Sequence, residues 1–201
     1  MEFINGTKVL TSDGRDAGNL HRVVIDPDTK QVTHIVIQKG FLFKDDKVVN
    51  IAKVIAASAD QIVLTCTMDE LKEMAPLEIK DYEPINEATV GNESRIPNVF
   101  SPGTSYGTFV VKEVKRTIPE ELAALKDGAQ VLSAEGEHVG HTEQVHMDPE
   151  TSNVTQFIIT EGAMAKKRKS IPVEWVRMID DEQVFLNVPA QEVANLPEVQ
   201  A

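Results

Sequence analysis

The chain has 201 residues, of which 41% are apolar and 5% are aromatic, a composition ordinary for a globular protein. Its formal net charge of -12 disfavours loose association with nucleic acid or anionic lipid. No apolar run approaches the ~18 residues of a membrane-spanning helix, and the N-terminus lacks the pattern of a secretory signal. The single cysteine, Cys66, excludes an internal disulfide. We therefore expect an acidic cytoplasmic protein without a transmembrane segment.

The first 77 residues predict one small β domain. Runs rich in β-branched residues, several with apolar and polar residues alternating, occur at 7–11, 18–26, 31–39, 47–51 and 60–66. The short turn before residue 31 favours a hairpin. The stretch MDELKEMAP at 68–76 predicts a short helix with Asp69 as its N-cap, limited by Pro76.

Residues 78–125 are predicted to be a linker. They begin with a stretch bearing Pro, Asn and Ser that shows no steady period. Apolar and polar residues then alternate over 106–118, which predicts an extra strand. The segment PEELAALKDG at 119–128 predicts a helical turn between Pro119 and Gly128.

The C-terminal part repeats the N-terminal part. An offset of 122 aligns 6–76 with 128–198 without a gap, and 19 of the 71 positions are identical. The identical positions are mainly turn glycines and apolar residues, so turns and core are what the two copies share. Residues 126–201 are therefore predicted to be a second β domain. Several short strands per copy favour a strongly bent sheet that closes into a barrel, because closure removes exposed edges.

Two stretches carry a family resemblance. VLTSDGRDAGNLHRVVIDPDTKQVTHIVIQKG in the first copy resembles the PRC-barrel family, as does VLSAEGEHVGHTEQVHMDPETSNVTQFIITEG in the second. The family includes the cytoplasmic part of the photosynthetic reaction-centre H subunit and the C-terminal domain of a ribosome-maturation factor. The resemblance implies an all-β fold, mainly β with short helices, of two small PRC-type barrels in tandem. It implies contacts with proteins rather than catalysis.

The most motif-like residues are a doubled Asp-Pro-acid-Thr. Asp26 and Pro27 begin the first occurrence, and Asp148 and Pro149 begin the second. Asp at the first position and Pro at the second suit a type I turn, because the carboxylate accepts a backbone hydrogen bond and proline presets φ. A calcium loop needs more oxygen ligands at regular spacing. We therefore interpret these residues as structural turns.

Two surface features differ between the copies and are candidates for a partner surface. The first is the apolar group Phe41, Leu42 and Phe43, which either packs within the molecule or marks an interface. The second is the basic run of Lys166, Lys167, Arg168 and Lys169 in the acidic second copy. We expect this run to be a solvated loop. An acidic partner, or the chain's own acidic linker, is the alternative.

No catalytic constellation, metal site or cofactor site is predicted. His138, His141 and His146 form the only histidine cluster, but strand alternation places His141 and His146 on opposite faces and no fourth ligand is present. We expect these histidines to be exposed. Cys66 is predicted to be a core residue, since nothing in the sequence marks a basic partner for a nucleophile.

The sequence favours a non-enzymatic protein-interaction or assembly module with an unidentified protein partner, which includes self-association. One alternative is a ribosome- or RNA-associated factor that uses residues 166–169, although the net charge makes nucleic acid a disfavoured partner. Another is a small-ligand or metal-binding protein.

Overall fold

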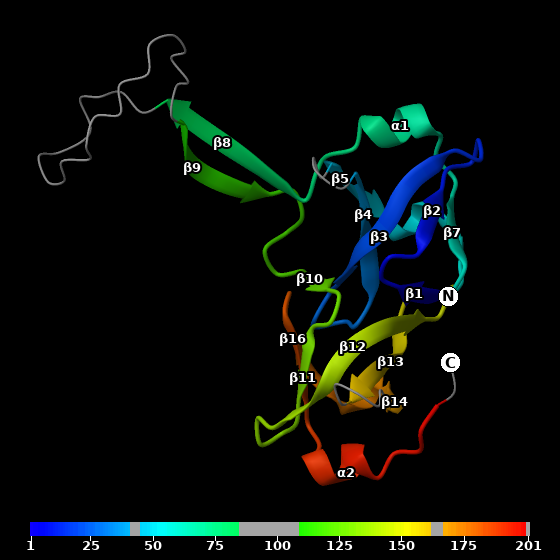
Figure 1. Ribbon diagram of the computed structural model, residues 1–201, viewed down its shortest axis with the longest axis vertical. Helices are drawn as coiled ribbons and strands as arrows, with labels where there is room; N and C mark the ends of the chain where they lie inside the picture. Colours follow the sequence, from blue (N-terminus) through cyan, green and yellow to red (C-terminus); the bar gives the residue numbers. More distant parts are fainter. Residues whose placement is uncertain (41–44, 85–108, 162–166, 200–201) are drawn as a thin grey trace, which may run out of the picture. The chain divides into compact units, whose positions relative to one another are not determined.

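The computed structural model describes residues 1–40, 45–84, 109–161 and 167–199. This part of the chain is mainly β with two short α-helices, which confirms the predicted fold class at this level (Figure 1). Both repeats belong to one compact unit, residues 1–77 together with 118–201, and residues 78–117 form a second unit.

The first repeat contains seven strands, a 3₁₀ turn and a helix. They are β1 (Glu2–Ile4), β2 (Lys8–Leu10), β3 (Asp16–Ile25), β4 (Val32–Lys39), β5 (Asp45–Asn50), η1 (Ile51–Lys53), β6 (Val54–Ala57), β7 (Gln61–Leu64) and α1 (Met68–Lys72). The second repeats this order as β10 (Ala123–Lys126), β11 (Gln130–Leu132), β12 (His138–Met147), β13 (Val154–Glu161), β14 (Lys167–Pro172), η3 (Val173–Trp175), β15 (Val176–Ile179), β16 (Gln183–Leu186) and α2 (Ala190–Ala194).

Both repeats have the same sheet topology. Strand order is β5-β4-β3-β2-β7-β6 in the first and β14-β13-β12-β11-β16-β15 in the second, with β2 and β11 parallel to their neighbours β7 and β16. Among the described residues the two end strands of each order do not pair with one another. The predicted closure into barrels is therefore not shown.

The repeats exchange their first strands. β1 pairs with β12 of the second repeat, and β10, which precedes the second repeat, pairs with β3 of the first. The registers correspond across the offset of 122, because Phe3 faces Val145 and Leu125 faces Val23. Each sheet is thus completed by a strand from the other half of the chain, as in an intramolecular dimer.

The hairpin turns also join the repeats. Gln31 and Asn153, which are equivalent positions, form an antiparallel bridge. On its two sides the N–H of Val32 donates to Ser152 O at 2.9 Å and the N–H of Val154 donates to Lys30 O at 2.8 Å. These bonds are equivalent across the repeat, so this contact has approximate two-fold symmetry.

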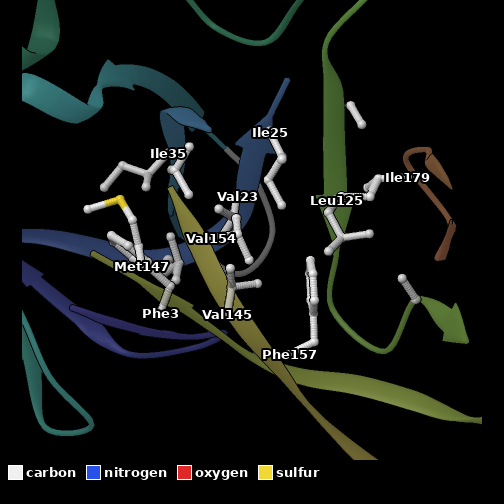
Figure 2. Packing of buried hydrophobic residues seen from close by; sticks show 14 of the residues in the cluster. Phe3, Val23, Ile25, Ile35, Leu125, Val145, Met147, Val154, Phe157 and Ile179 are labelled. Carbon is white, nitrogen blue, oxygen red and sulfur yellow. The ribbon is translucent and has the colours of Figure 1, made fainter. Parts of the chain in front are cut away.

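One hydrophobic core extends through both repeats. Phe3 and Phe157 are each 1% exposed and belong to a single cluster that includes buried residues from all parts of the compact unit. Figure 2 shows Phe3, Val23, Leu125 and Val145 among the packed side chains of this cluster. The two repeats therefore share their core.

A smaller apolar cluster lies on the other face of the first sheet. It contains Val24, Val36 and Ala124, together with Leu77 and Ile118, the residues at which the chain leaves and re-enters the compact unit. Leu77 and Ile118 therefore pack within the compact unit. Within the segment between them, β8 (Glu78–Pro84) and β9 (Phe109–Arg116) form an antiparallel pair. β9 lies inside the predicted strand 106–118, whereas β8 had no sequence signal.

Two local predictions are wrong. Residues 119–128 are not helical, because 123–126 form β10 and pair with β3. The helix-forming residues of this segment are overridden by burial, as Ala124 is 0% exposed and Leu125 is 4% exposed. In α1 the N-cap is Thr67 rather than Asp69, since Thr67 and Glu70 form a reciprocal capping box.

Candidate functional site

A small cavity lies where the repeats meet. It has a volume of about 30 Å³ and is lined by equivalent residues of both repeats, among them Phe3 with Leu125, Asn5 with Asp127, and Val23 with Val145. Asn5 Oδ1 is buried and has no hydrogen-bond partner. A space of this size holds one or two water molecules, so the cavity suits a buried water rather than a substrate.

A larger open groove borders the first repeat. It encloses about 600 Å³ and is lined by 5–6, 16, 18–21 and 38–40. Its charged groups interact with one another: Lys39 Nζ donates to Asp16 O at 2.5 Å, and Lys8 Nζ lies 3.4 Å from Asp16 Oδ2. The N–H of Gly18 also donates to Asp16 Oδ1, and this bond lowers the pKa of the Asp16 carboxyl. These contacts leave the carboxylate engaged with its own strand.

The doubled Asp-Pro residues form turns that hold backbone donors. Asp26 Oδ1 accepts from the N–H of Asp28 at 2.9 Å and from that of Thr29 at 3.1 Å. These two bonds, the one from Thr29 foremost, lower the pKa of the Asp26 carboxyl. Asp148 Oδ1 accepts equivalent bonds from the N–H groups of residues 150 and 151. Because the same turns lead into the Gln31–Asn153 bridge, they also shape the contact between repeats.

Residues 167–169 of the basic run lie in a strand rather than a solvated loop. Lys167, Arg168 and Lys169 begin β14, and each is paired with a carboxylate. Arg168 makes a two-bond contact with Glu143, in which Nε donates to Oε2 at 2.9 Å. The prediction of a solvated loop is therefore wrong for 167–169, because strand pairing was not recognisable from four consecutive cations. Lys166, Phe41, Leu42 and Phe43 lie outside the described residues.

Lys169 is the most constrained of these cations. The whole residue is 4% exposed, although its partner Glu161 has a side chain that is 45% exposed. Its Nζ lies 2.9 Å from Glu161 Oε2 and donates at 3.1 Å to Ala194 O, the carbonyl of the last residue of α2. A cation at a helix C-terminus complements the carbonyl groups there. Lys169 therefore connects β14 with α2.

The edge strands differ between the repeats. β6 is the last strand in the order of the first sheet, and its sequence, Val-Ile-Ala-Ala, contains no charge. Ile55 on this strand is 57% exposed. The equivalent strand β15 carries Arg177 where β6 carries Ile55, and Met178 beside it is 45% exposed. The first repeat thus presents an uncharged edge and the second a charged one.

Single ionisable residues outside these features are also located. Cys66 is buried, as predicted, and burial raises the pKa of its thiol. Burial likewise lowers the pKa values of His34 and His146. His138 and His141 are exposed on β12, with ring centroids 4.5 Å apart. Within the described ranges no group of three or more His, Cys, Asp or Glu side chains is arranged to hold a metal ion.

Family models match each repeat separately. The PRC-barrel domain matches residues 4–67, which supports the resemblance of the first repeat. Residues 125–194 match a family described as an uncharacterized protein conserved in bacteria, DUF2171, so a second PRC-barrel is not shown. A search of curated proteins found no match. No helix within the described residues is long and apolar enough to cross a membrane.

Proposed function

We propose that this protein is a non-enzymatic protein-interaction or assembly module built from two PRC-type barrels. The PRC-barrel match of the first repeat supports the fold part of this proposal, and the common topology and register of the repeats support extending it to the second. The exposed edge strand β6 supports the functional part and is the observation that carries it.

β6 is an edge strand of four residues with an irregular register at Ile55, and within the described residues one of its sides is open. It pairs with β7 along one side, and no other described strand pairs with it. An exposed strand edge offers backbone N–H and C=O groups to a second extended chain. Ile55 and Ala56 are both exposed and can contact apolar side chains on such a chain. The partner is therefore an extended, apolar segment of another protein or of a second copy.

The second repeat provides an internal comparison. Charged residues on edge strands oppose edge-to-edge pairing, because a partner strand would have to desolvate them. On β15 the charged residue is Arg177, whereas β6 has the uncharged Ile55 at the equivalent position. Strand addition is therefore assigned to the first repeat alone.

The test is crosslinking and pull-down at physiological salt from the native cell, with the wild type and Ile55→Arg compared. The substitution gives β6 the charged residue of β15 and should abolish recovery of a stoichiometric partner, or abolish dimerisation measured by light scattering. Arg177→Lys, which keeps the charge on β15, is the matched control and should leave recovery unchanged. Equal recovery with Ile55→Arg would contradict the proposal.

The proposal places the protein in the cytoplasm, where the reducing conditions keep a lone cysteine such as Cys66 as a thiol. Subcellular fractionation tests this location.

A further inference from the structure

Two histidines converge on β12 although the sequence spacing does not indicate it. Residues three apart on a regular strand point to opposite faces. In β12, however, Gly140 faces Val131 and His138 faces Leu132, so Val139 is an extra residue in the register. This bulge brings the rings of His138 and His141 to a centroid separation of 4.5 Å with an angle of 58° between their planes.

The backbone around the bulge fixes this arrangement. Gly140 has φ +152, and a Cβ at this position would lie 2.7 Å from Thr160 O on β13. Only glycine therefore fits between the two histidines without a shift of β13. Val139 is 8% exposed and belongs to the shared core, whereas both histidines are exposed. The bulge thus buries Val139 and leaves both imidazoles in solvent.

One hydrogen bond determines the tautomer of His141. Its Nδ1 lies 3.0 Å from Gly128 O. A carbonyl oxygen only accepts hydrogen bonds, so Nδ1 carries the proton and Nε2 of the neutral ring keeps its lone pair. Histidines that bind metals typically donate the other ring N–H to a carbonyl or carboxylate in this way, which orients the ring. His141 is therefore oriented as a metal ligand before any ion arrives.

We propose that His138 and His141 form a site for a borderline transition-metal ion such as Zn²⁺ or Ni²⁺. A tetrahedral ion bound at ~2.0–2.1 Å to each nitrogen needs the two donor atoms roughly 3.3 Å apart. Rotation of the exposed His138 side chain can provide this separation while His141 keeps its bond to Gly128 O. Imidazole suits these ions, whereas Ca²⁺ and Mg²⁺ prefer oxygen ligands. Water or a donor from another molecule completes the coordination. The inference does not depend on the proposed interaction function.

The first repeat shows why one ion per chain is expected. Asp16 and Asn19 occupy the positions equivalent to His138 and His141. Asp16 Oδ1 accepts from the N–H of Gly18 at 2.8 Å and its Oδ2 lies 3.4 Å from Lys8 Nζ. That carboxylate is engaged by a backbone N–H and by a lysine of its own repeat, and neither equivalent position carries an imidazole. The site belongs to the second repeat.

The experiment is isothermal titration of the full-length, tag-free and metal-free protein with Zn²⁺ and with Ni²⁺, followed by imidazole ¹⁵N NMR. Saturable binding of one ion per chain is expected, with the Nε2 resonance of His141 shifted. His138→Asn and His141→Asn should each weaken binding at least tenfold. Both side chains are exposed, so unchanged far-UV circular dichroism should show that both variants fold.

His146→Asn is the matched control on the same strand. His146 Nε2 lies 3.1 Å from Gln144 Oε1 and its ring is partly buried, so this variant should bind with unchanged affinity. Titration with Ca²⁺ or Mg²⁺ should give no binding. Absence of saturable Zn²⁺ and Ni²⁺ binding, or binding that survives both asparagine substitutions, would overturn the inference.

Discussion

The exchange of first strands predicts that the two repeats unfold together. Phe3 belongs to the first repeat in the sequence, but it pairs with Val145 in the sheet of the second repeat and is 1% exposed. Truncation of a fully buried phenylalanine costs about 3–5 kcal/mol, since both the transfer free energy and a cavity contribute. Phe3→Ala should lower the free energy of unfolding by this amount.

The reciprocal variant is Leu125→Ala, which removes a side chain that faces Val23 in the first sheet and should cost about 2–5 kcal/mol. Guanidinium unfolding should be followed by far-UV circular dichroism, which reports the whole chain, and by fluorescence of Trp175, the single tryptophan, which reports the second repeat. Because the repeats share one core, both signals should shift by the same free energy in both variants.

Val114→Ala is the control for an apolar truncation outside the core. Val114 is 48% exposed and lies in the unit formed by 78–117, so the change in unfolding free energy should stay within about 0.5 kcal/mol. The reasoning would be refuted if Leu125→Ala weakened the circular dichroism transition while the Trp175 transition stayed in place. That result would mean that the repeats unfold as independent domains.

Three further predictions test local interactions by urea unfolding. Asp26→Ala should lower the free energy of unfolding by about 0.5–2 kcal/mol at pH 7, as for the loss of a helix cap. Folding lowers the pKa of Asp26, so the stability that this carboxylate contributes is fully present above the pKa of an unfolded Asp. It is lost as the pH falls through the pKa of the folded state, so wild type and variant should be equally stable in strong acid. Lys169→Met should cost about 1.5–3 kcal/mol because it removes a buried charged donor. Lys167→Met, at an exposed pair, should cost clearly less, and equal losses would contradict the assigned burial. Gly18→Ala should lower the free energy of unfolding by more than about 2 kcal/mol, since Gly18 has φ +111 and the Cβ would lie 2.4 Å from a backbone oxygen of β4. Gly14 has φ +73 but open space around it, so Gly14→Ala should lower this free energy by about 1–2 kcal/mol. Similar values for the two glycines would show that the close approach in β3 relaxes freely.

Local patterns were sufficient where a strand or turn is specified by neighbouring residues. The alternation around Ile35 and Ile37 indicated β4, and the Asp-Pro pair at 26–27 indicated the turn before it. The helix at 68–72 lies within the predicted stretch 68–76, but its N-cap is Thr67 rather than Asp69, because Thr67 and Glu70 form the capping box. The repeat was detectable because turn glycines and core residues keep their spacing.

The errors arose where a partner distant in the chain decides the structure. Residues 123–126 have good helix formers, yet they form a strand because β3 offers an unpaired edge and the core buries Leu125. Residues 167–169 were predicted to be a solvated loop because their carboxylate partners, at 143, 161 and 198, are not adjacent to them in the sequence. The convergence of His138 and His141 depends on one extra residue in the register, which alternation alone cannot reveal.

By itself, the sequence indicated the β class, the correspondence between residues 6–76 and 128–198, and the turns. These depend on short-range periodicity and on residues with special backbone preferences. The tertiary structure decided that the two copies form one body. Strand exchange requires that β1 and β10 each pair with the equivalent strand in the other copy. Because the two sheets have the same topology and register, the sequence pattern does not indicate which copy each strand joins. Only the path of the chain in space selects between these pairings, and here it selects the exchanged one.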